Sequence, residues 1–299
     1  MLSEFPKFKK IELLDKEDIE KITKKFLPYS DFNFVSMWSW DIKGEMRLSV
    51  LNDNLVVRFT DYLTSLPFYS FLGNNKVSET IKELISFSKE KYNCDFLKLI
   101  PAETIGNMDK ADFDLKPEED AYDYIFSISH LSNMNKWPKH SSSKNIRSFF
   151  KSCPNYTVKD NHIKDLNKSE YLKMFEKWAD NKGLDNSFEL NEYKALERIF
   201  QMKQDNLKVI SLYVNNILVG FAIHEILSTD YAISHFAKAD MKCHRGTNDT
   251  LNWAEAKILD SLGVKYFNWE QDLGIMGLKK AKEKYSPAFY FKKFIVSLK

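Results

Sequence analysis

The second half of the chain has an apolar pattern that predicts an antiparallel meander followed by a helix and a strand. Its extended runs are rich in β-branched and aromatic residues and are predicted as strands at 209–214, 217–223 and 231–237. Asn215-Asn216, between the first two runs, tolerates the positive φ of a tight hairpin turn. Apolar residues then keep a helical spacing from Leu251 to Leu262, and 266–269 is predicted as a strand.

The first half of the chain repeats this order. Strands at 46–51 and 55–59 flank the turn Asn52-Asp53-Asn54, and a further extended segment covers 63–71. A helix from Ser78 to about Tyr92 and a buried strand follow, the strand at 96–100. Helical segments precede both meanders and are predicted at 15–26, 169–180 and 191–202.

Helices, a meander, a crossover helix and a strand form the element order of the GNAT acyltransferase fold. We therefore predict an α+β protein with two tandem GNAT-like domains, each a mixed, largely antiparallel sheet flanked by helices. The boundary is placed near residue 140, in the basic, serine-rich stretch 136–151, which gives domains 1–140 and 141–299. The halves share little residue identity, so a chance likeness between two common α+β patterns is the alternative to a duplication.

Composition narrows the class of protein. With 299 residues, 43% of them hydrophobic, the chain can bury a core and is not a disordered protein. Cys94, Cys153 and Cys243 are widely separated and provide neither a disulfide framework nor a CxxC metal site, which favours a reducing compartment. The sequence has no apolar run of membrane-spanning length and no signal-peptide pattern, so we expect a cytoplasmic protein without a transmembrane segment.

The overall charge is nearly neutral, but charge is unevenly distributed. Lys+Arg number 44 against 42 Asp+Glu, a net charge of +2 that conceals an acidic run at 109–123 and a basic stretch at 136–151. Near the C-terminus, four lysines fall within six residues, at Lys279, Lys280, Lys282 and Lys284. Because like charges repel, such a cluster faces either water or an anion.

The densest group of candidate chemical residues lies just before these lysines. Glu270 and Asp272 are two residues apart, so on an extended strand they share a face and form a carboxylate pair. One carboxylate could serve as a general base while the other positions a substrate amine. The alternative is that both are strand-end residues ion-paired with the lysines. Gly274 and Gly277 permit a close backbone approach at this point.

A second candidate site is the loop Lys242 to Asn248, which precedes a predicted helix as the pyrophosphate loop of GNAT enzymes does. Arg245 and Gly246 fit an anion-binding loop, but the second glycine of such loops is missing, which weighs against coenzyme A. A solvated loop that caps the helix is the alternative. Cys243 beside His244 is a weaker candidate nucleophile, because adjacency in sequence shows no positioned base.

Several segments resemble the aminoacyltransferase domain at the C-terminus of bacterial phosphatidylglycerol lysyltransferases. The resemblance is closer still to the stand-alone soluble proteins that share this domain, and it covers most of the chain. The most specific segment runs from Asn268 to Pro287, with the order asparagine, glutamate, aspartate-leucine-glycine, then leucine-lysine-lysine, lysine, tyrosine and proline. The segments that resemble the other signatures of the family are 29–32, 123–125, 144–149 and 235–240.

This resemblance implies a tandem GNAT-like acyltransferase with its active site between the domains and no metal. In the lysyltransferases the donor is aminoacyl-tRNA and the acceptor is a lipid hydroxyl. Glu270 or Asp272 would then act as the base, and Lys238 or Tyr285 would stabilise the developing oxyanion. The residues expected to bind the donor or its phosphates are Lys144, Arg147, Arg245, Gly246, Lys279, Lys280, Lys282 and Lys284.

Two departures from the family leave the acceptor open. Trp137-Pro138-Lys139-His140 and three serines stand where the family has a glycine and a basic run, and the sequence lacks the membrane-spanning part of the lysyltransferases. We expect transfer of an aminoacyl or acyl group to an amine or hydroxyl of a small molecule or lipid headgroup, with tRNA as a partner. The alternatives are a coenzyme-A-dependent N-acyltransferase and a non-catalytic module that binds an anion or a partner. Six histidines without ligand spacing predict no metal site, and His235 and His244 are the two that flank the candidate site.

Overall fold

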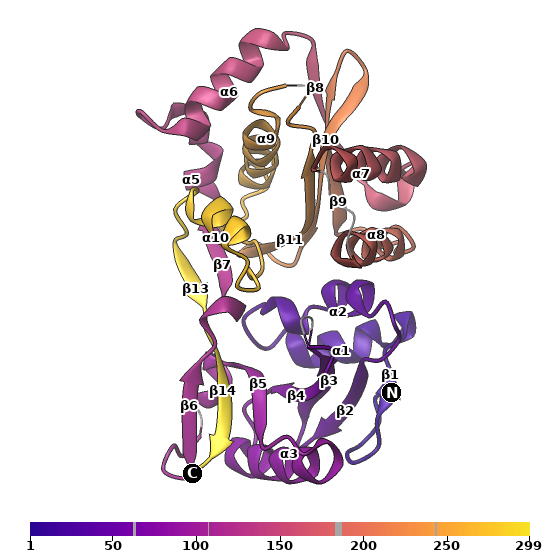
Figure 1. Ribbon diagram of the computed structural model, residues 1–299, viewed down its shortest axis with the longest axis vertical. Helices are drawn as coiled ribbons and strands as arrows, with labels where there is room; N and C mark the ends of the chain where they lie inside the picture. Colours follow the sequence, from indigo (N-terminus) through magenta and orange to yellow (C-terminus); the bar gives the residue numbers. More distant parts are fainter. Residues whose placement is uncertain (62–63, 107, 183–186, 243) are drawn as a thin grey trace. The chain divides into compact units, whose positions relative to one another are not determined.

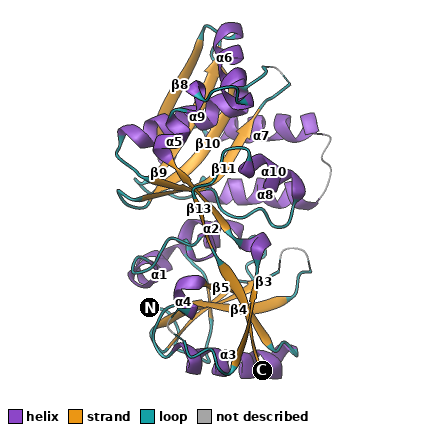
Figure 2. Cartoon of the chain, turned by 90° about the vertical axis from the view of Figure 1, so that its left-hand side faces the viewer, coloured by secondary structure: helices purple, strands orange, loops and turns teal. Residues whose placement is uncertain are grey.

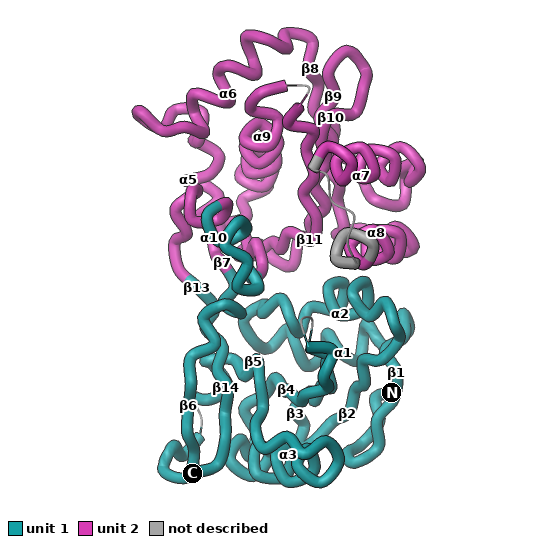
Figure 3. Tube along the Cα trace, in the orientation of Figure 1, with its two compact units in different colours: residues 1–123, 271–280, 290–299 teal, residues 124–270, 281–289 magenta. Residues whose placement is uncertain are grey.

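The computed structural model describes residues 1–61, 64–106, 108–182, 187–242 and 244–299. The chain forms two compact units (Figure 3). Unit 1 contains residues 1–123, 271–280 and 290–299, and unit 2 contains residues 124–270 and 281–289. The boundary expected near residue 140 falls inside unit 2, just before helix α6 (Ser141–Ser152). The serine-rich segment is therefore helical rather than a linker, because Ile146 and Phe149 bury one of its faces.

Unit 1 is built from two antiparallel sheets. The first has the order β1 (Lys9–Lys10), β2 (Arg47–Leu51), β3 (Asn54–Thr60) and β4 (Pro67–Leu72). The second has the order β5 (Phe96–Pro101), β14 (Lys293–Leu298) and β6 (Phe113–Pro117). The helices of unit 1 are α1 (Lys16–Thr23), α2 (Phe34–Trp40), α3 (Val77–Tyr92) and α4 (Ala102–Ile105). The C-terminal strand β14 thus lies between two strands from the first half of the chain (Figure 1).

The core of unit 1 explains why its predicted elements form. Helix α3 places Ile81, Leu84 and Ile85 on one face, and this face packs with buried residues of β4 and with Val296 of β14. The β2–β3 hairpin turns at Asn52 and Asp53, whose φ angles are +52° and +60°. Both residue types adopt positive φ more readily than most, so the hairpin predicted at this position is confirmed.

Unit 2 is built on a seven-stranded sheet with helices on both faces (Figures 1 and 2). Its strand order is β13 (Phe289–Phe291), β7 (Asp123–Ser127), β12 (Tyr266–Asn268), β11 (Tyr231–Ala239), β10 (Ile217–Ile226), β9 (Leu207–Val214) and β8 (Tyr156–His162). Helices α5 (Ile128–Ser132), α6 and α9 (Thr247–Ser261) cover one face. Helices α7 (Lys168–Lys182) and α8 (Ser187–Ile199) cover the other, and α10 (Met276–Glu283) follows β12 in the chain. The predicted meander, crossover helix and final strand are confirmed as β9–β11, α9 and β12.

Two neighbouring strands of this sheet, β11 and β12, are paired along only part of their length. Strands β11 and β12 pair in parallel only from Tyr231 opposite Tyr266 to Ile233 opposite Asn268, although β11 continues to Ala239. Just beyond this point β11 has a bulge, since Ile223 pairs with Phe236 and His224 with Ser234, which leaves His235 as the extra residue. Bulges re-aim side chains, and here the bulge lies where the sheet opens.

Candidate active site

The opening between β11 and β12 brings together a histidine and two glutamates. His235, the bulge residue, has its Nδ1 3.6 Å from Oε1 of Glu270 and its Nε2 3.6 Å from Oε2 of Glu225. The side chains of His235 and Glu225 are about 1% exposed, whereas that of Glu270 is 22% exposed. We call His235, Glu225 and Glu270 the histidine cluster. Its one solvent-accessible carboxylate, that of Glu270, is one of the two that the sequence suggested as a base.

The histidine cluster carries more negative than positive charge. Burial lowers the pKa of His235, but hydrogen bonding and charge interactions with Glu225 and Glu270 outweigh burial and raise this pKa to about 9. The imidazole is therefore protonated at neutral pH and stabilises the carboxylate of Glu270. With two carboxylates for one imidazolium, a partner that fits this site would itself be cationic or would supply a proton.

The expected carboxylate pair on one strand face is wrong. Strand β12 ends at Asn268, and Glu270 has a φ of +57°, so the backbone beyond the strand is not extended. Asp272 is 2% exposed, and its Oδ1 accepts a hydrogen bond from the backbone N–H of Gly274 at 2.8 Å. Asp272 thus shapes the turn in which it lies, as aspartates often do. Its proposed role as a base stays a prediction.

Lys238 on β11 lies in an acidic and aromatic surrounding. Its Nζ is 2.5 Å from Oε1 of Glu192 and 4.0 Å from the ring centre of Trp178. The ring of Phe175 is 5.6 Å away. An ammonium over an aromatic face is stabilised by the ring quadrupole as well as by the carboxylate. The oxyanion role proposed for Lys238 would therefore use an N–H of the ammonium that is not donated to Glu192.

A third group gathers at the N-terminus of α9 around the buried carboxylate of Asp249. Its Oδ1 accepts hydrogen bonds from Lys284 at 2.6 Å and from the Tyr285 hydroxyl at 2.8 Å, and its Oδ2 accepts one from Asn145 at 2.7 Å. Burial raises the pKa of Asp249, but hydrogen bonds from Lys284, Asn145 and Ser142, and the charge of Lys284, hold it below its usual range. Burial and the Asp249 charge together raise the pKa of Tyr285. Tyr285 and Lys284, two predicted site residues, thus meet at an aspartate that the sequence did not suggest.

The loop before α9 is in close contact with α6. Gly246 has a φ of +90°, and a Cβ at this position would lie 2.3 Å from the backbone oxygen of Asn145. Arg245 Nε donates to Oδ1 of Asn145 at 3.3 Å. The side of Gly246 on which a side chain would stand is therefore covered by the α6 backbone. Cys243 lies outside the described residues.

The other predicted cations are on the surface or have partners. Lys144 and Arg147 are exposed on α6, where Arg147 Nη1 donates to the backbone oxygen of Asn135 at 3.2 Å. Lys280 is exposed and Lys279 half-buried on α10. Lys282 donates to the backbone oxygen of Trp269 at 2.5 Å. Within unit 2, the structure places Lys144 and Arg147 on the helix whose Asn145 contacts Arg245 and Asp249.

Sequence reasoning missed a buried lysine in unit 1. Lys293 on β14 is fully buried, and its Nζ forms an ion pair with Asp31, lies 2.7 Å from Oδ1 of Asp123 and 3.2 Å from Oε1 of Gln271. Asp123 also accepts hydrogen bonds from Ser30, at 2.7 Å from its N–H and 2.6 Å from its hydroxyl. We call Lys293, Asp31, Asp123, Gln271 and Ser30 the lysine cluster. The sequence feature that could have indicated this cluster is a lysine at an inward-facing position of the apolar run 289–298.

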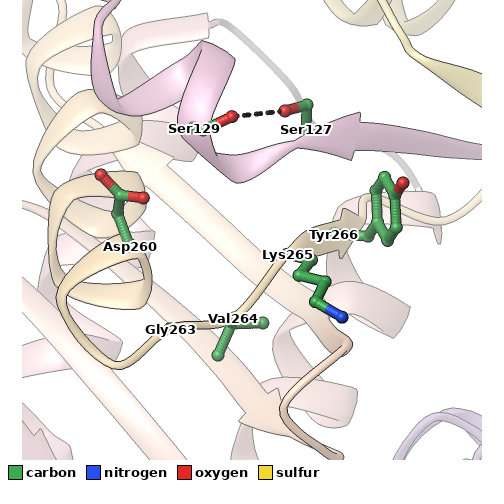
Figure 4. Close-up of a pocket in the computed structure, with 7 residues that line it drawn as sticks. All are labelled: Ser127, Ser129, Asp260, Gly263, Val264, Lys265 and Tyr266. Atoms are coloured by element: carbon green, nitrogen blue, oxygen red, sulfur yellow. Dashed lines mark hydrogen bonds between the residues drawn. The ribbon is translucent and has the colours of Figure 1, made fainter.

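The described residues also form a small surface pocket away from these groups. It has a volume of about 310 Å³ and lies where β7, the end of α9 and β12 meet (Figure 4). Its lining residues are Ser127, Ser129, Asp260, Gly263, Val264, Lys265 and Tyr266. None of the predicted site residues lines it, so we assign it no part in the site.

The described residues contain neither a metal-binding cluster nor a membrane-spanning helix. Among these residues, no group of three or more histidine, cysteine, aspartate or glutamate side chains is arranged to hold a metal ion. No helix within them combines the length and the apolar character needed to cross a bilayer.

Comparison with known proteins settles the family. The family described as phosphatidylglycerol lysyltransferase, C-terminal, matches residues 24–297. The chain belongs to this family. The sequence has no significant match among curated proteins. The lysine cluster draws on three of the segments that resemble the lysyltransferase signatures, since Ser30 and Asp31, Asp123 and Gln271 come from one segment each.

Solved structures show the same fold for this member of the lysyltransferase C-terminal family. A conserved protein of unknown function from Bacteroides thetaiotaomicron VPI-5482 is 24% identical, with a TM-score of 0.82 over 98% of this chain and 99% of that one. The C-terminal domain of a putative lysylphosphatidylglycerol synthetase from Agrobacterium fabrum is 11% identical, with a TM-score of 0.62 over 95% and 91%. L-PGS from Bacillus licheniformis is 14% identical, with a TM-score of 0.60 over 99% and 93%.

These findings confirm the predicted family resemblance and fold class, except that unit 1 has two antiparallel sheets where one mixed sheet was expected. The chain is an α+β protein with tandem GNAT-like architecture, and it is a domain of the aminoacyl- or acyltransferase type. Whether its halves arose by duplication stays a prediction, as do its compartment, its donor and its acceptor.

Proposed function

We propose that this protein transfers an aminoacyl group from aminoacyl-tRNA to an amine or hydroxyl acceptor, with Glu270 as the group that accepts the acceptor's proton. The observation that carries the proposal is the histidine cluster at the opening between β11 and β12. Glu270 is the one member of the cluster that is partly exposed. The protonated His235 is paired with the Glu270 carboxylate on one side. A positioned carboxylate that is partly open to solvent can accept a proton from a bound acceptor.

The proposed step is a nucleophilic acyl substitution. The acceptor nitrogen or oxygen attacks the ester carbonyl carbon of the aminoacyl group, and its proton moves to Glu270. The bond from this carbon to the terminal ribose oxygen of tRNA then breaks, and the ribose oxygen takes up a proton. A new amide or ester is formed, and free tRNA leaves. The step needs no metal and no redox partner.

The charge of the histidine cluster favours an aminoacyl donor over acyl-coenzyme A. An aminoacyl group carries an ammonium next to the reacting carbonyl, which matches the excess negative charge of Glu225 and Glu270 over His235. The loop from Lys242 to Asn248 lacks the second glycine with which a GNAT enzyme holds a pyrophosphate, and this weighs against coenzyme A. Exposed Lys144, Arg147 and Arg245 offer cations for tRNA phosphates.

Binding of tRNA is the first test. We expect the purified full chain to retain aminoacylated tRNA on a filter, with an affinity that falls linearly on logarithmic axes as salt is raised. Acetyl-coenzyme A should leave the melting temperature unchanged, whereas a ligand of the native state would raise it. Absence of salt-dependent retention would refute the aminoacyl-tRNA donor, and a thermal shift with acetyl-coenzyme A would favour the acyl-coenzyme A alternative.

A further inference from the structure

The loop that links the candidate base to α10 has a strained backbone. Glu270, Leu273 and Gly274 have φ angles of +57°, +58° and +70°. For a residue with a Cβ, this conformation is unfavourable and persists only where the surroundings fix it. Glu270 and Leu273 both pay this conformational penalty within a few residues, so something must hold this loop in place.

Within unit 1, backbone hydrogen bonds fix the second part of the loop. The N–H of Leu273 donates to the backbone oxygen of Asp120 at 3.1 Å, and the N–H of Ile275 donates to that of Asp272 at 3.0 Å. Gly274 is close to Asp120 as well, because a Cβ at Gly274 would lie 3.0 Å from its Oδ2. These contacts hold the second part of the loop.

The first part of the loop is held by the lysine cluster. Lys293 Nζ is 3.2 Å from Oε1 of Gln271, and Nε2 of Gln271 donates to Oδ1 of Asp31 at 3.4 Å. The amide of Gln271 thus uses both its oxygen and its nitrogen on a buried, charged group. Lys293 in turn cannot move, because Asp123 and Asp31 hold its ammonium. A hydrogen bond to a charged partner is roughly twice as strong as a neutral one.

From this geometry we infer that Lys293 is a positioning residue, which fixes Gln271 and through it the strained loop that begins at Glu270. The inference rests on the proposed function in one respect: the loop matters for activity because it places Glu270, the proposed base. A lysine that served stability alone would not need a bond to Gln271. Replacing a buried ion pair by apolar residues is often neutral for stability, so the pairing of Lys293 is by itself weak evidence for a purely stabilising role.

Hydrogen exchange tests this role without any assumption about substrate. We propose measuring exchange of the amides of 273–275 in Gln271→Ala, which removes the loop's link but leaves Lys293 paired with both aspartates. We expect these amides to exchange roughly tenfold faster or more, while amides of β9 and β10 keep their wild-type rates. Lys293→Met should also raise exchange at 273–275, together with exchange elsewhere in unit 1, because it removes stability as well as the link to Gln271. Lys292→Met is the matched control, because Lys292 is the exposed neighbour of Lys293 in the chain.

Two results would overturn the positioning role. One is unchanged exchange at 273–275 in Gln271→Ala. The other is an increase in Gln271→Ala that is as large across β2, β3 and β4 as at 273–275, which would indicate a loss of global stability only. Where transfer is measurable, Gln271→Ala should lower kcat while KM for aminoacyl-tRNA stays unchanged. An equal change in kcat and in KM would also contradict the role. If exchange behaves as expected but no transfer occurs, the proposed function fails and the positioning role stands.

Discussion

The lysine cluster of unit 1 and the histidine cluster of unit 2 have the same charge count but different exposure. Each contains one cation and two carboxylates. In the lysine cluster the side chains of Lys293 and Asp123 are fully buried and that of Asp31 is 5% exposed. In the histidine cluster Glu270 is 22% exposed, although its partners are buried. The comparison indicates that a sealed cluster fixes the backbone, whereas a cluster with one exposed carboxylate is available to a substrate.

The largest expected effect on stability comes from breaking the sealed cluster. Lys293→Met would leave two buried carboxylates without their cation, and we expect a loss of about 3–5 kcal/mol in the free energy of unfolding. Urea unfolding measures this loss. Replacing Asp31 and Asp123 by asparagine in the same variant should recover most of it, because no charge then stays buried. Lys292→Met should change the free energy by less than about 0.5 kcal/mol.

The histidine cluster should make stability fall at alkaline pH. The pKa of His235 is about 9, above its ordinary value of 6.5. The native state therefore binds this proton more tightly than the unfolded state does. The contribution, on the order of 3 kcal/mol, is fully present below about pH 6.5 and is lost as pH rises through 9. In His235→Gln, the free energy of unfolding should change less between pH 6.5 and 9 than it does in the wild type. The same pH dependence in both proteins would contradict the assignment.

The lysine cluster should show a smaller pH effect in a lower range. Burial, and the charge of Asp123, raise the pKa of Asp31 to about 6 despite its pairing with Lys293. The native state then binds the Asp31 proton more tightly than the unfolded state, so stability should decrease by on the order of 2 kcal/mol as pH rises from about 4 to 6. Unfolding of Asp31→Asn over this range should lack that decrease. A difference in stability between wild type and Asp31→Asn that stays constant over this range would refute the assignment for Asp31.

The sequence predicted the local elements well because they depend on neighbouring residues. Alternation and turn residues located β9, β10 and the Asn215-Asn216 turn, whose φ angles are +50° and +63°. The domain boundary was expected in the stretch that forms helix α6, because its many serines leave only a narrow apolar stripe in the sequence. Strand β8 was missed, since an edge strand with many polar residues has no clear alternation.

The sites depend on contacts that a linear pattern does not contain. The family resemblance directed attention to Glu270 and Tyr285, but the partners of these residues, His235 and Asp249, come from distant segments. Lys293 and Asp31 are separated by most of the chain. In a window of sequence, a buried lysine is only an interruption of an apolar run, so its role emerges only when the strands pair.

The most direct test of the account is transfer by Glu270→Gln under single-turnover conditions. The donor is tRNA charged with a labelled amino acid, and the acceptors are vesicles containing phosphatidylglycerol in one arm and ethanolamine in the other. We expect wild-type protein to transfer label in at least one arm and Glu270→Gln to be slower by about 10²–10⁴-fold with tRNA binding intact. Glu283→Gln, an exposed control on α10, should match wild type. Transfer by Glu270→Gln at the wild-type rate would contradict the claim that the exposed carboxylate of the histidine cluster is the base.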